Sequence, residues 1–492
     1  MSNNNFNQNK LTKKIKYAPK SETTLLFGGL TPTREKLLQA AAKSLGERYI
    51  YLPNIDYKSY ELGKIYGNKA QCNPTYFTVG NLIKYLFYLK DEVGLTKEEI
   101  ISKYVHVTVN GCGPCRFGMY ITEYKKALKD AGFDGFRVVS FEHDSNIFQV
   151  AQEQVVTFSP KFFLILTQTT LIADILTILG DKMRPYEKEK GSVDKAINKC
   201  ENLIINSLNK KKSLLITLFK CRNILSKVEL NKIQPKPKVM VMGEFWAAMT
   251  RSDGNYHIHK FLEDEGAEVI SQPLINRILL NVWEAEYKRE LTQDFDKKDG
   301  IDFSTTKSKF MIFTAKKAIR YTFAIYSKAI GLKGYHLADM DYLYKISKDY
   351  YPVDSNGGEG QLEVAHLLEN IEKKEANLVV SIKPFGCMPS SGVSDGIQSL
   401  VTSKFKNANF ISIETSGDGA VNFYSRLQMA LFKAKEQAQD EFNSLYNTKL
   451  EEKLKQDIKL LNKINQYSFE PNSKLTTTAG KILKFIRDKY SL

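Results

Sequence analysis

The sequence predicts an α/β protein built from parallel, doubly wound sheets, and three observations support this fold class. Apolar strand patterns alternate with amphipathic helix patterns near the N-terminus, as in TLLFGGLT, REKLLQAAAKSLGER and RYIYLP. A second alternating run begins at VMVMGEFW and continues to NFISIE. Glycine turns follow several of the expected strands, at the positions where parallel sheets usually carry ligand loops.

The first alternating run predicts one α/β domain over residues 22–150, after a basic tail at residues 1–21 that we expect to be disordered. Its expected strands are TLLFGGLT, RYIYLP, YVHVTVN and FRVVSF. Its expected helices are REKLLQAAAKSLGER, TVGNLIKYLFYLKDEV and residues 119–131, which place apolar residues at helical spacing.

The rest of the chain divides into three predicted parts. Residues 151–235 are expected to be a helical segment, in which polar residues such as Asp174 interrupt the apolar stretch 162–179. We therefore expect a buried helix there and no membrane span. Residues 236–436 predict a second α/β domain with a helical excursion between residues 276 and 351, and residues 437–492 predict a charged helical tail.

The distribution of charge and the number of cysteines argue against two classes of protein, nucleic-acid-binding proteins and disulfide-stapled secreted proteins. The 492 residues carry a formal net charge of +16, but the lysines are scattered and no nucleic-acid-reading motif accompanies them. We therefore expect no nucleic-acid partner, and instead an acidic ligand such as the phosphates of CoA, or an acidic protein. Six cysteines are too few for a disulfide-stapled secreted protein. The polar opening residues lack an apolar leader, so we expect a cytoplasmic protein.

The histidines give a weaker signal. His257 and His259 alternate as they would along a strand. No third ligand at a suitable spacing accompanies them, so we expect a surface pair and no metal site.

Four cysteines lie beside turn-forming residues, on expected loops. They are Cys72 in QCNPTYF, Cys112 and Cys115 in NGCGPCRFG, and Cys387 in KPFGCMPSSG. Thiolates on such loops are the usual ligands of iron–sulfur clusters. Cys200 and Cys221 lie in helical, lysine-flanked stretches, and we expect them to be structural.

Two further residues are candidate functional groups. Arg116 follows Cys115 directly and is predicted to stabilise a reduced, more negative cluster. Glu244, in MGEFW, lies at the end of an expected strand, where a carboxylate is suited to proton transfer or to accepting backbone amides.

The residues alone leave other interpretations open. CGPC after a strand and before a helix is also the motif of thioredoxin-like dithiols, although Gly111 stands where their tryptophan usually precedes it. Zinc binding by these thiols, or buried thiols without a ligand, are further alternatives.

Several longer motifs resemble those of a known protein family. The chain resembles the 2-hydroxyglutaryl-CoA dehydratase family, in its large activase-related branch, from about residue 22 to residue 436. The resemblance lies in TLLFGGLTPT, GNKAQCNPTYFTVGNLIKYL, GCGPCRFGMYITEYKKALKDAGFDGFRVV, MGEFW, SNGGEGQLEVA, KPFGCMPSSGVSDG and IETSGDGAVNFYSRLQMALFKAK.

This resemblance implies two flavodoxin-like, or Rossmann-like, domains with a [4Fe–4S] cluster held between them by three cysteines. The matching positions are Cys72, Cys115 and Cys387, and Cys112 is additional, as a fourth ligand, a replacement or a bystander. Related reductases hold a double-cubane cluster, which would require further ligands.

The resemblance also implies a reaction and its partners. One strongly reducing electron turns an acyl-CoA thioester into a ketyl radical, which then loses its 2-hydroxyl group. A separate ATP-hydrolysing activase of the actin/Hsp70 type delivers the electron, because this chain has no convincing phosphate-binding loop. The expected assembly is a homodimer or heterodimer, and a non-catalytic electron carrier on the same scaffold is the further alternative.

Overall fold

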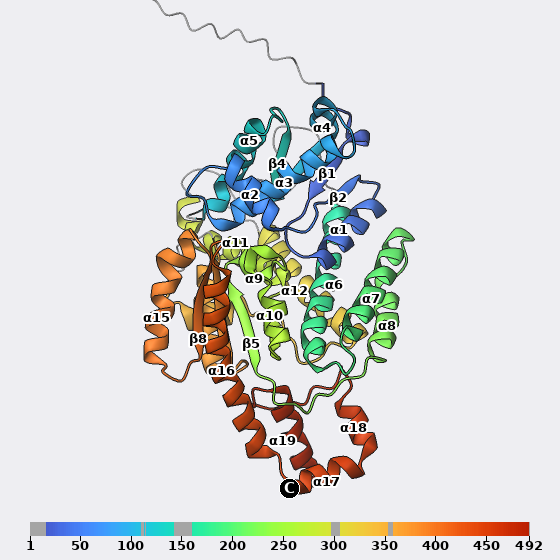
Figure 1. The fold of residues 1–492 in the computed structure, drawn as a ribbon, viewed down its shortest axis with the longest axis vertical. Helices are drawn as coiled ribbons and strands as arrows, with labels where there is room; N and C mark the ends of the chain where they lie inside the picture. The colour runs from blue at the N-terminus through green and yellow to red at the C-terminus, as the bar shows by residue number, and fades with distance from the viewer. Residues whose placement is uncertain are drawn as a thin grey trace, which may run out of the picture.

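The computed structural model describes residues 16–109, 113, 115–141, 160–296, 306–352 and 358–491. Within these ranges it contains two four-stranded parallel sheets with helices packed around them (Figure 1). The predicted α/β class is therefore confirmed.

The first sheet has the strand order β2-β1-β3-β4. Its strands are β1 (Thr24–Phe27), β2 (Tyr49–Tyr51), β3 (Tyr104–Val109) and β4 (Arg137–Phe141). The accompanying helices are η1 (Lys20–Glu22), α1 (Pro32–Ser44), α2 (Tyr57–Tyr66), α3 (Asn73–Asp91), α4 (Lys97–Lys103), η2 (Arg116–Met119) and α5 (Tyr120–Asp130). Leu25, Leu26, Val105 and Val107 are all buried, as expected where helices cover both faces of a central strand pair.

The second sheet repeats this arrangement, with the order β6-β5-β7-β8. Its strands are β5 (Lys238–Gly243), β6 (Glu268–Ser271), β7 (Leu378–Pro384) and β8 (Phe410–Thr415). The accompanying helices are α9 (Phe245–Met249), η4 (Asp253–Asn255), α10 (Ile258–Asp264), α14 (Gly360–Lys373), η5 (Ser390–Ser394), α15 (Asp395–Lys404) and α16 (Ala420–Leu445). In each half the first strand pairs with both the second and the third strand of that half, so the two halves share one topology.

The two predicted helical stretches pack into a single bundle. The first contributes α6 (Pro160–Met183), η3 (Arg184–Tyr186), α7 (Ser192–Asn209) and α8 (Leu214–Leu225); the second contributes α11 (Leu274–Asp296), α12 (Thr306–Ile330) and α13 (Met340–Ser347). Their buried side chains form one hydrophobic core, which also includes Leu37 and Ala41 of α1. Among the described residues, α6 is the one helix apolar and long enough to cross a membrane, but 61% of its apolar window is buried inside the protein. The prediction of a buried helix is confirmed.

The C-terminal helices lie at the end of the molecule farthest from the first sheet (Figure 1). They are α17 (Thr448–Gln456), α18 (Ile458–Ile464) and α19 (Thr478–Tyr490), and they have a small apolar core of their own. A buried carboxylate on β6 anchors this region: Glu268 accepts a hydrogen bond from Thr478 at 2.6 Å and pairs with Lys238 at 3.4 Å. The domain boundary predicted at residue 436 falls inside α16, which runs without a break to Leu445.

Glycines allow α2 and α3 to cross with their backbones in contact. A Cβ atom on Gly80 of α3 would lie 1.7 Å from the Ser59 carbonyl oxygen, and one on Gly63 of α2 would lie 1.9 Å from the Tyr76 carbonyl oxygen. Helix α2 was not predicted from the sequence. Its clearest signal is the N-cap Asp56, whose side chain accepts a hydrogen bond from the Ser59 amide.

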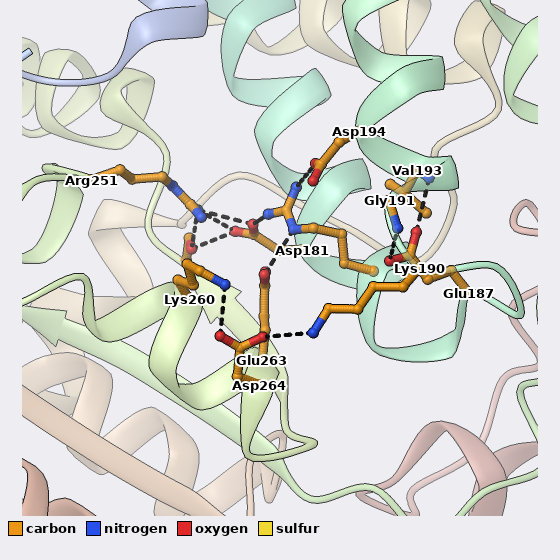
Figure 2. A network of polar contacts seen from close by, with 12 residues as sticks. Asp181, Glu187, Lys190, Gly191, Val193, Asp194, Arg251, Lys260, Glu263 and Asp264 are labelled. Atoms are coloured by element: carbon orange, nitrogen blue, oxygen red, sulfur yellow. Dashed lines mark hydrogen bonds and ion pairs between the residues drawn. The ribbon is translucent and has the colours of Figure 1, made fainter.

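A buried ionic network joins the helical bundle to the second sheet (Figure 2). Asp181 of α6 accepts hydrogen bonds from Arg251 at 2.7 Å and from Ser271 of β6 at 2.6 Å, and it also pairs with Arg184. Arg184 in turn donates to Glu263 of α10 at 2.8 Å. Burial opposes ionisation of Asp181, but the two guanidinium groups hold its pKa below the usual value.

His259 lies beside this network, within α10. The expected surface position is confirmed for His257, which is exposed at the N-cap of α10, but it is wrong for His259, which lies within the helix and is only 2% exposed. In the described part of the chain, neither ring nitrogen of His259 has a hydrogen-bond partner. Burial, together with the positive charge of Arg251, lowers the pKa of His259 to about 3.

Substitution of Gly80 tests the crossing of α2 and α3. We expect Gly80→Ala to lower the free energy of unfolding by at least about 3 kcal/mol, because the new methyl group meets backbone that cannot move aside cheaply. Urea denaturation measures this change. The control is Gly396→Ala, since Gly396 has open space around its Cβ position and should tolerate alanine. Equal stabilities for the two variants would contradict the close crossing.

Buried His259 predicts a pH dependence of stability. The folded protein keeps this imidazole neutral, whereas the unfolded chain binds a proton below about pH 6.5. The free energy of unfolding should therefore fall as the pH falls from 6.5 toward 3, with His259 contributing about 2 kcal/mol between pH 6.5 and 4.5. Denaturation curves of the native protein and of His259→Gln should differ in this slope. Parallel pH profiles would show that His259 is not held neutral.

Candidate functional site

The site lies where the order of each sheet reverses. In open α/β sheets, ligands bind in the crevice at the carboxyl ends of the two strands that flank this reversal. In the first sheet these strands are β1 and β3, which lead to Gly29 and Cys115. In the second sheet they are β5 and β7, which lead to Glu244 and Cys387.

The loops of the two halves are in direct contact. The Asn73 amide at the start of α3 donates to the Phe385 carbonyl at 3.1 Å. A Cβ atom on Gly386, which has φ 81°, would lie 3.3 Å from the Cα atom of Cys72. Cys72 of the first half therefore lies directly against the loop that carries Cys387.

The third thiol joins this group through the start of α14. A Cβ atom on Gly358 would lie 2.7 Å from Pro389 and 4.0 Å from the Cβ atom of Cys115. The structure thus brings Cys72, Cys115 and Cys387 together from separate loops of both halves. Cys112 lies outside the described residues.

Trp246 of α9 holds the two halves together beside the thiols. Its indole N–H donates to the Gly29 carbonyl at 2.8 Å, and its ring contacts Phe77 of α3. Glu35 of α1 fixes the same glycine loop by accepting hydrogen bonds from the amides of Gly29 and Leu30. This contact could not be predicted from the sequence, because Trp246 follows an expected strand end and lies 217 residues from Gly29.

Each thiol has a distinct set of partners. Cys72 is the N-cap of α3, and its sulfur lies 2.9 Å from the Tyr120 hydroxyl and 3.2 Å from the Thr75 hydroxyl. Cys387 lies 3.3 Å from the Ser390 hydroxyl. Burial raises the pKa of all three thiols, to about 12 for Cys115.

Glu244 lies among these thiols, at the N-cap of α9. Its carboxylate accepts a hydrogen bond from the Ala247 amide at 2.9 Å, which is the structural role expected at a strand end. Burial and the neighbouring Glu359 raise the pKa of Glu244 to about 8, and its charge also raises the pKa of each of the three thiols. A buried carboxyl group that keeps its proton at neutral pH is suited to proton donation.

Arg116 contacts the Cys72 loop. One guanidinium nitrogen donates to the Ala70 carbonyl, and the buried Nε atom has no partner in the part of the chain that the structure describes. Arg116 therefore links the loop that carries Cys115 to the loop that carries Cys72. Its predicted effect on a reduced cluster stays a prediction.

Glu123 of α5 fixes the loop before Cys72. It accepts hydrogen bonds from the backbone and side-chain amides of Asn68, the latter at 2.6 Å, and from the Gln71 side chain at 3.5 Å. Glu123 is 4% exposed, so it acts as a buried acceptor for an otherwise irregular segment.

The site offers three buried thiols beside carboxyl groups. Among the described residues, no three His, Cys, Asp or Glu side chains are arranged to hold one metal ion. A single zinc ion needs all its ligands about 2.3 Å from one point, whereas the thiolates of a cluster bind different irons and stand farther apart. The Asn73 side-chain amide, next to Cys72 in the sequence, is buried and has no hydrogen-bond partner among the described residues.

Removing the Glu123 carboxylate should loosen the Cys72 loop. We expect Glu123→Ala to increase the rate at which iodoacetamide labels Cys72 in the native protein by about tenfold, because three hydrogen bonds to the loop are lost. Mass spectrometry of the labelled peptides measures the rate at each cysteine. Glu61→Ala, which removes an exposed carboxylate from α2, is the control and should leave labelling unchanged. Equal labelling of Cys72 in both variants would show that Glu123 does not hold the Cys72 loop in place.

Comparison with known proteins adds no assignment to this geometry. No protein-family model matches the sequence, and no curated protein matches it either.

Proposed function

We propose that this chain is an iron–sulfur protein of the 2-hydroxyacyl-CoA dehydratase type. In this proposal it accepts low-potential electrons from an ATP-dependent activase and uses them for dehydration or reduction of an acyl-CoA-like substrate. The observation that carries the proposal is the convergence of Cys72, Cys115 and Cys387 from loops of both halves. These are the three positions that the family resemblance implies as ligands.

The electrostatics of the site favour a bound cation. Three thiols share a buried region with Glu244, Glu359 and Glu363, and burial raises the pKa of each thiol. Thiols held in this way are poor nucleophiles, but a coordinating metal deprotonates them and supplies the missing positive charge. Iron would therefore stabilise the thiols in their deprotonated, ligating form, which burial otherwise disfavours.

Cys72, Cys115 and Cys387 would hold the cluster, and the bound cluster would supply a one-electron reductant and a Lewis-acidic iron. Glu244 holds a proton at its carboxyl group in the same region, which suits it to protonate a departing hydroxyl. Arg277 pairs with Glu359 at 3.1 Å and neutralises one of the neighbouring carboxylates. The activase is a separate partner, because the sequence lacks a convincing phosphate-binding loop.

Dithiol exchange is the weaker alternative. It needs a reactive thiolate, whereas burial raises the pKa of Cys115 to about 12. It also gives no role to Cys72 and Cys387, which lie beside Cys115.

Anaerobic purification with iron and sulfide analysis tests the proposal. We expect the native protein to bind iron and sulfide and to give a cluster EPR signal after reduction. Serine at Cys72, Cys115 or Cys387 should each lower the iron content at least several-fold, because each substitution removes one ligand. Serine at Cys200 or Cys221, which lie buried between α7 and α8, should leave iron content unchanged.

An iron-free protein after anaerobic reconstitution, active instead in disulfide reduction, would overturn the cluster assignment. If a cluster is present but no acyl-CoA perturbs its EPR signal, the result favours an electron carrier over an acyl-CoA reaction.

A further inference from the structure

The three candidate ligands differ in the hydrogen-bond donors that face them. Cys72 has two side-chain hydroxyl groups within reach, those of Tyr120 and Thr75. The two hydroxyl groups also share a hydrogen bond with each other, so Tyr120 lies between the Thr75 hydroxyl and the Cys72 sulfur. The Tyr120 ring is 7% exposed and Thr75 is 1% exposed, so no solvent competes for these protons.

The hydroxyl beside Cys387 is committed elsewhere. Ser390 donates its proton to Glu363 at 2.6 Å and accepts from the Cys387 thiol. A thiolate at Cys387 would therefore find the Ser390 oxygen and not its proton. At Cys115 the neighbouring donor is the Phe117 backbone amide. Among the described contacts, Cys72 is thus the candidate ligand with two hydroxyl groups within reach of its sulfur and no carboxylate accepting from either of them.

A metal-bound thiolate can only accept hydrogen bonds. When Cys72 loses its proton to become a ligand, the Tyr120 hydroxyl at 2.9 Å must act as a donor to the sulfur if this contact persists. Thr75 then donates either to the same sulfur or to the Tyr120 oxygen. Donors to a ligand sulfur withdraw electron density from a cluster and stabilise its more negative, reduced state.

We infer that Tyr120, assisted by Thr75, is a positioning residue that donates to the Cys72 thiolate and raises the midpoint potential of the cluster. This inference rests on the proposed function. It assigns the tuning role mainly to Tyr120 at Cys72, in addition to the role predicted for Arg116. The hydroxyls also distinguish one corner of the cluster from the other two.

The sign of the effect follows from the charge. One-electron reduction by titanium(III) citrate adds an electron to the cluster and oxidises Ti(III) to Ti(IV), so the thiolates become stronger acceptors. Loss of a hydrogen-bond donor therefore destabilises the reduced cluster more than the oxidised cluster. Tyr120→Phe should therefore make the midpoint potential more negative.

The experiment is an EPR-monitored redox titration of the anaerobically reconstituted protein. We expect Tyr120→Phe to lower the equilibrium constant for one-electron reduction about tenfold, which is a shift of about 59 mV to more negative potential. Thr75→Val should shift the potential in the same direction, and Thr75→Ser, which keeps the hydroxyl, should restore it. Tyr124→Phe, on the same helix but with its hydroxyl at Thr78, is the matched control and should leave the potential unchanged.

The outcomes separate this inference from the proposed function. A native protein without iron and sulfide contradicts the proposed function itself. If the native protein and Tyr120→Phe have equal iron content and the same midpoint potential, the inferred role of Tyr120 is wrong. The proposed cluster is then still supported. Loss of iron in Tyr120→Phe with full retention in Tyr124→Phe would show a role in holding Cys72 and would contradict tuning.

Discussion

The hydrogen bond from the Trp246 indole to the Gly29 carbonyl joins the segments that follow β1 and β5, the first strands of two topologically equivalent sheets. A second bond, from the Asn73 amide to the Phe385 carbonyl, closes the same junction next to the thiols. Each bond contributes only about 1 kcal/mol to stability, but each also fixes the spacing of loops that would otherwise be independent. Gly386 permits the approach, because a side chain there would press on Cys72. The three-thiol site exists only while the two halves are held in this register.

Burial raises the pKa values of both the Cys115 thiol and the Glu244 carboxyl group, and neighbouring carboxylates raise them further. The structure stabilises such groups elsewhere by pairing them, as Asp181 is paired with Arg184 and Arg251. Around the cysteines, Arg277 and Lys383 pair with Glu359 and Asp395, respectively, and leave Glu244 without a cationic partner among the described ion pairs. The buried carboxylate of Asp181 is therefore neutralised by guanidinium groups, whereas the buried carboxyl group of Glu244 is not. This difference is the physical reason for proposing a functional site at the cysteines.

The sequence predicts much of this arrangement, within clear limits. Apolar runs bounded by glycine predicted the strands, and cysteines on the following loops indicated the site, because parallel strands present their carboxyl ends at one edge. Helix α2 was missed because its apolar face is short and aromatic. Tyr120 was missed because it lies 48 residues from Cys72 and only tertiary packing brings them together. His259 was misplaced because a short helix can imitate the alternation of a strand.

The central claim is that the three thiols hold one cluster between the halves. Anomalous diffraction at the iron edge, from crystals of anaerobically reconstituted protein, tests it most directly. We expect iron within bonding distance of the sulfur atoms of Cys72, Cys115 and Cys387. Iron bound at another place, or thiols that remain free in fully reconstituted protein, would contradict it.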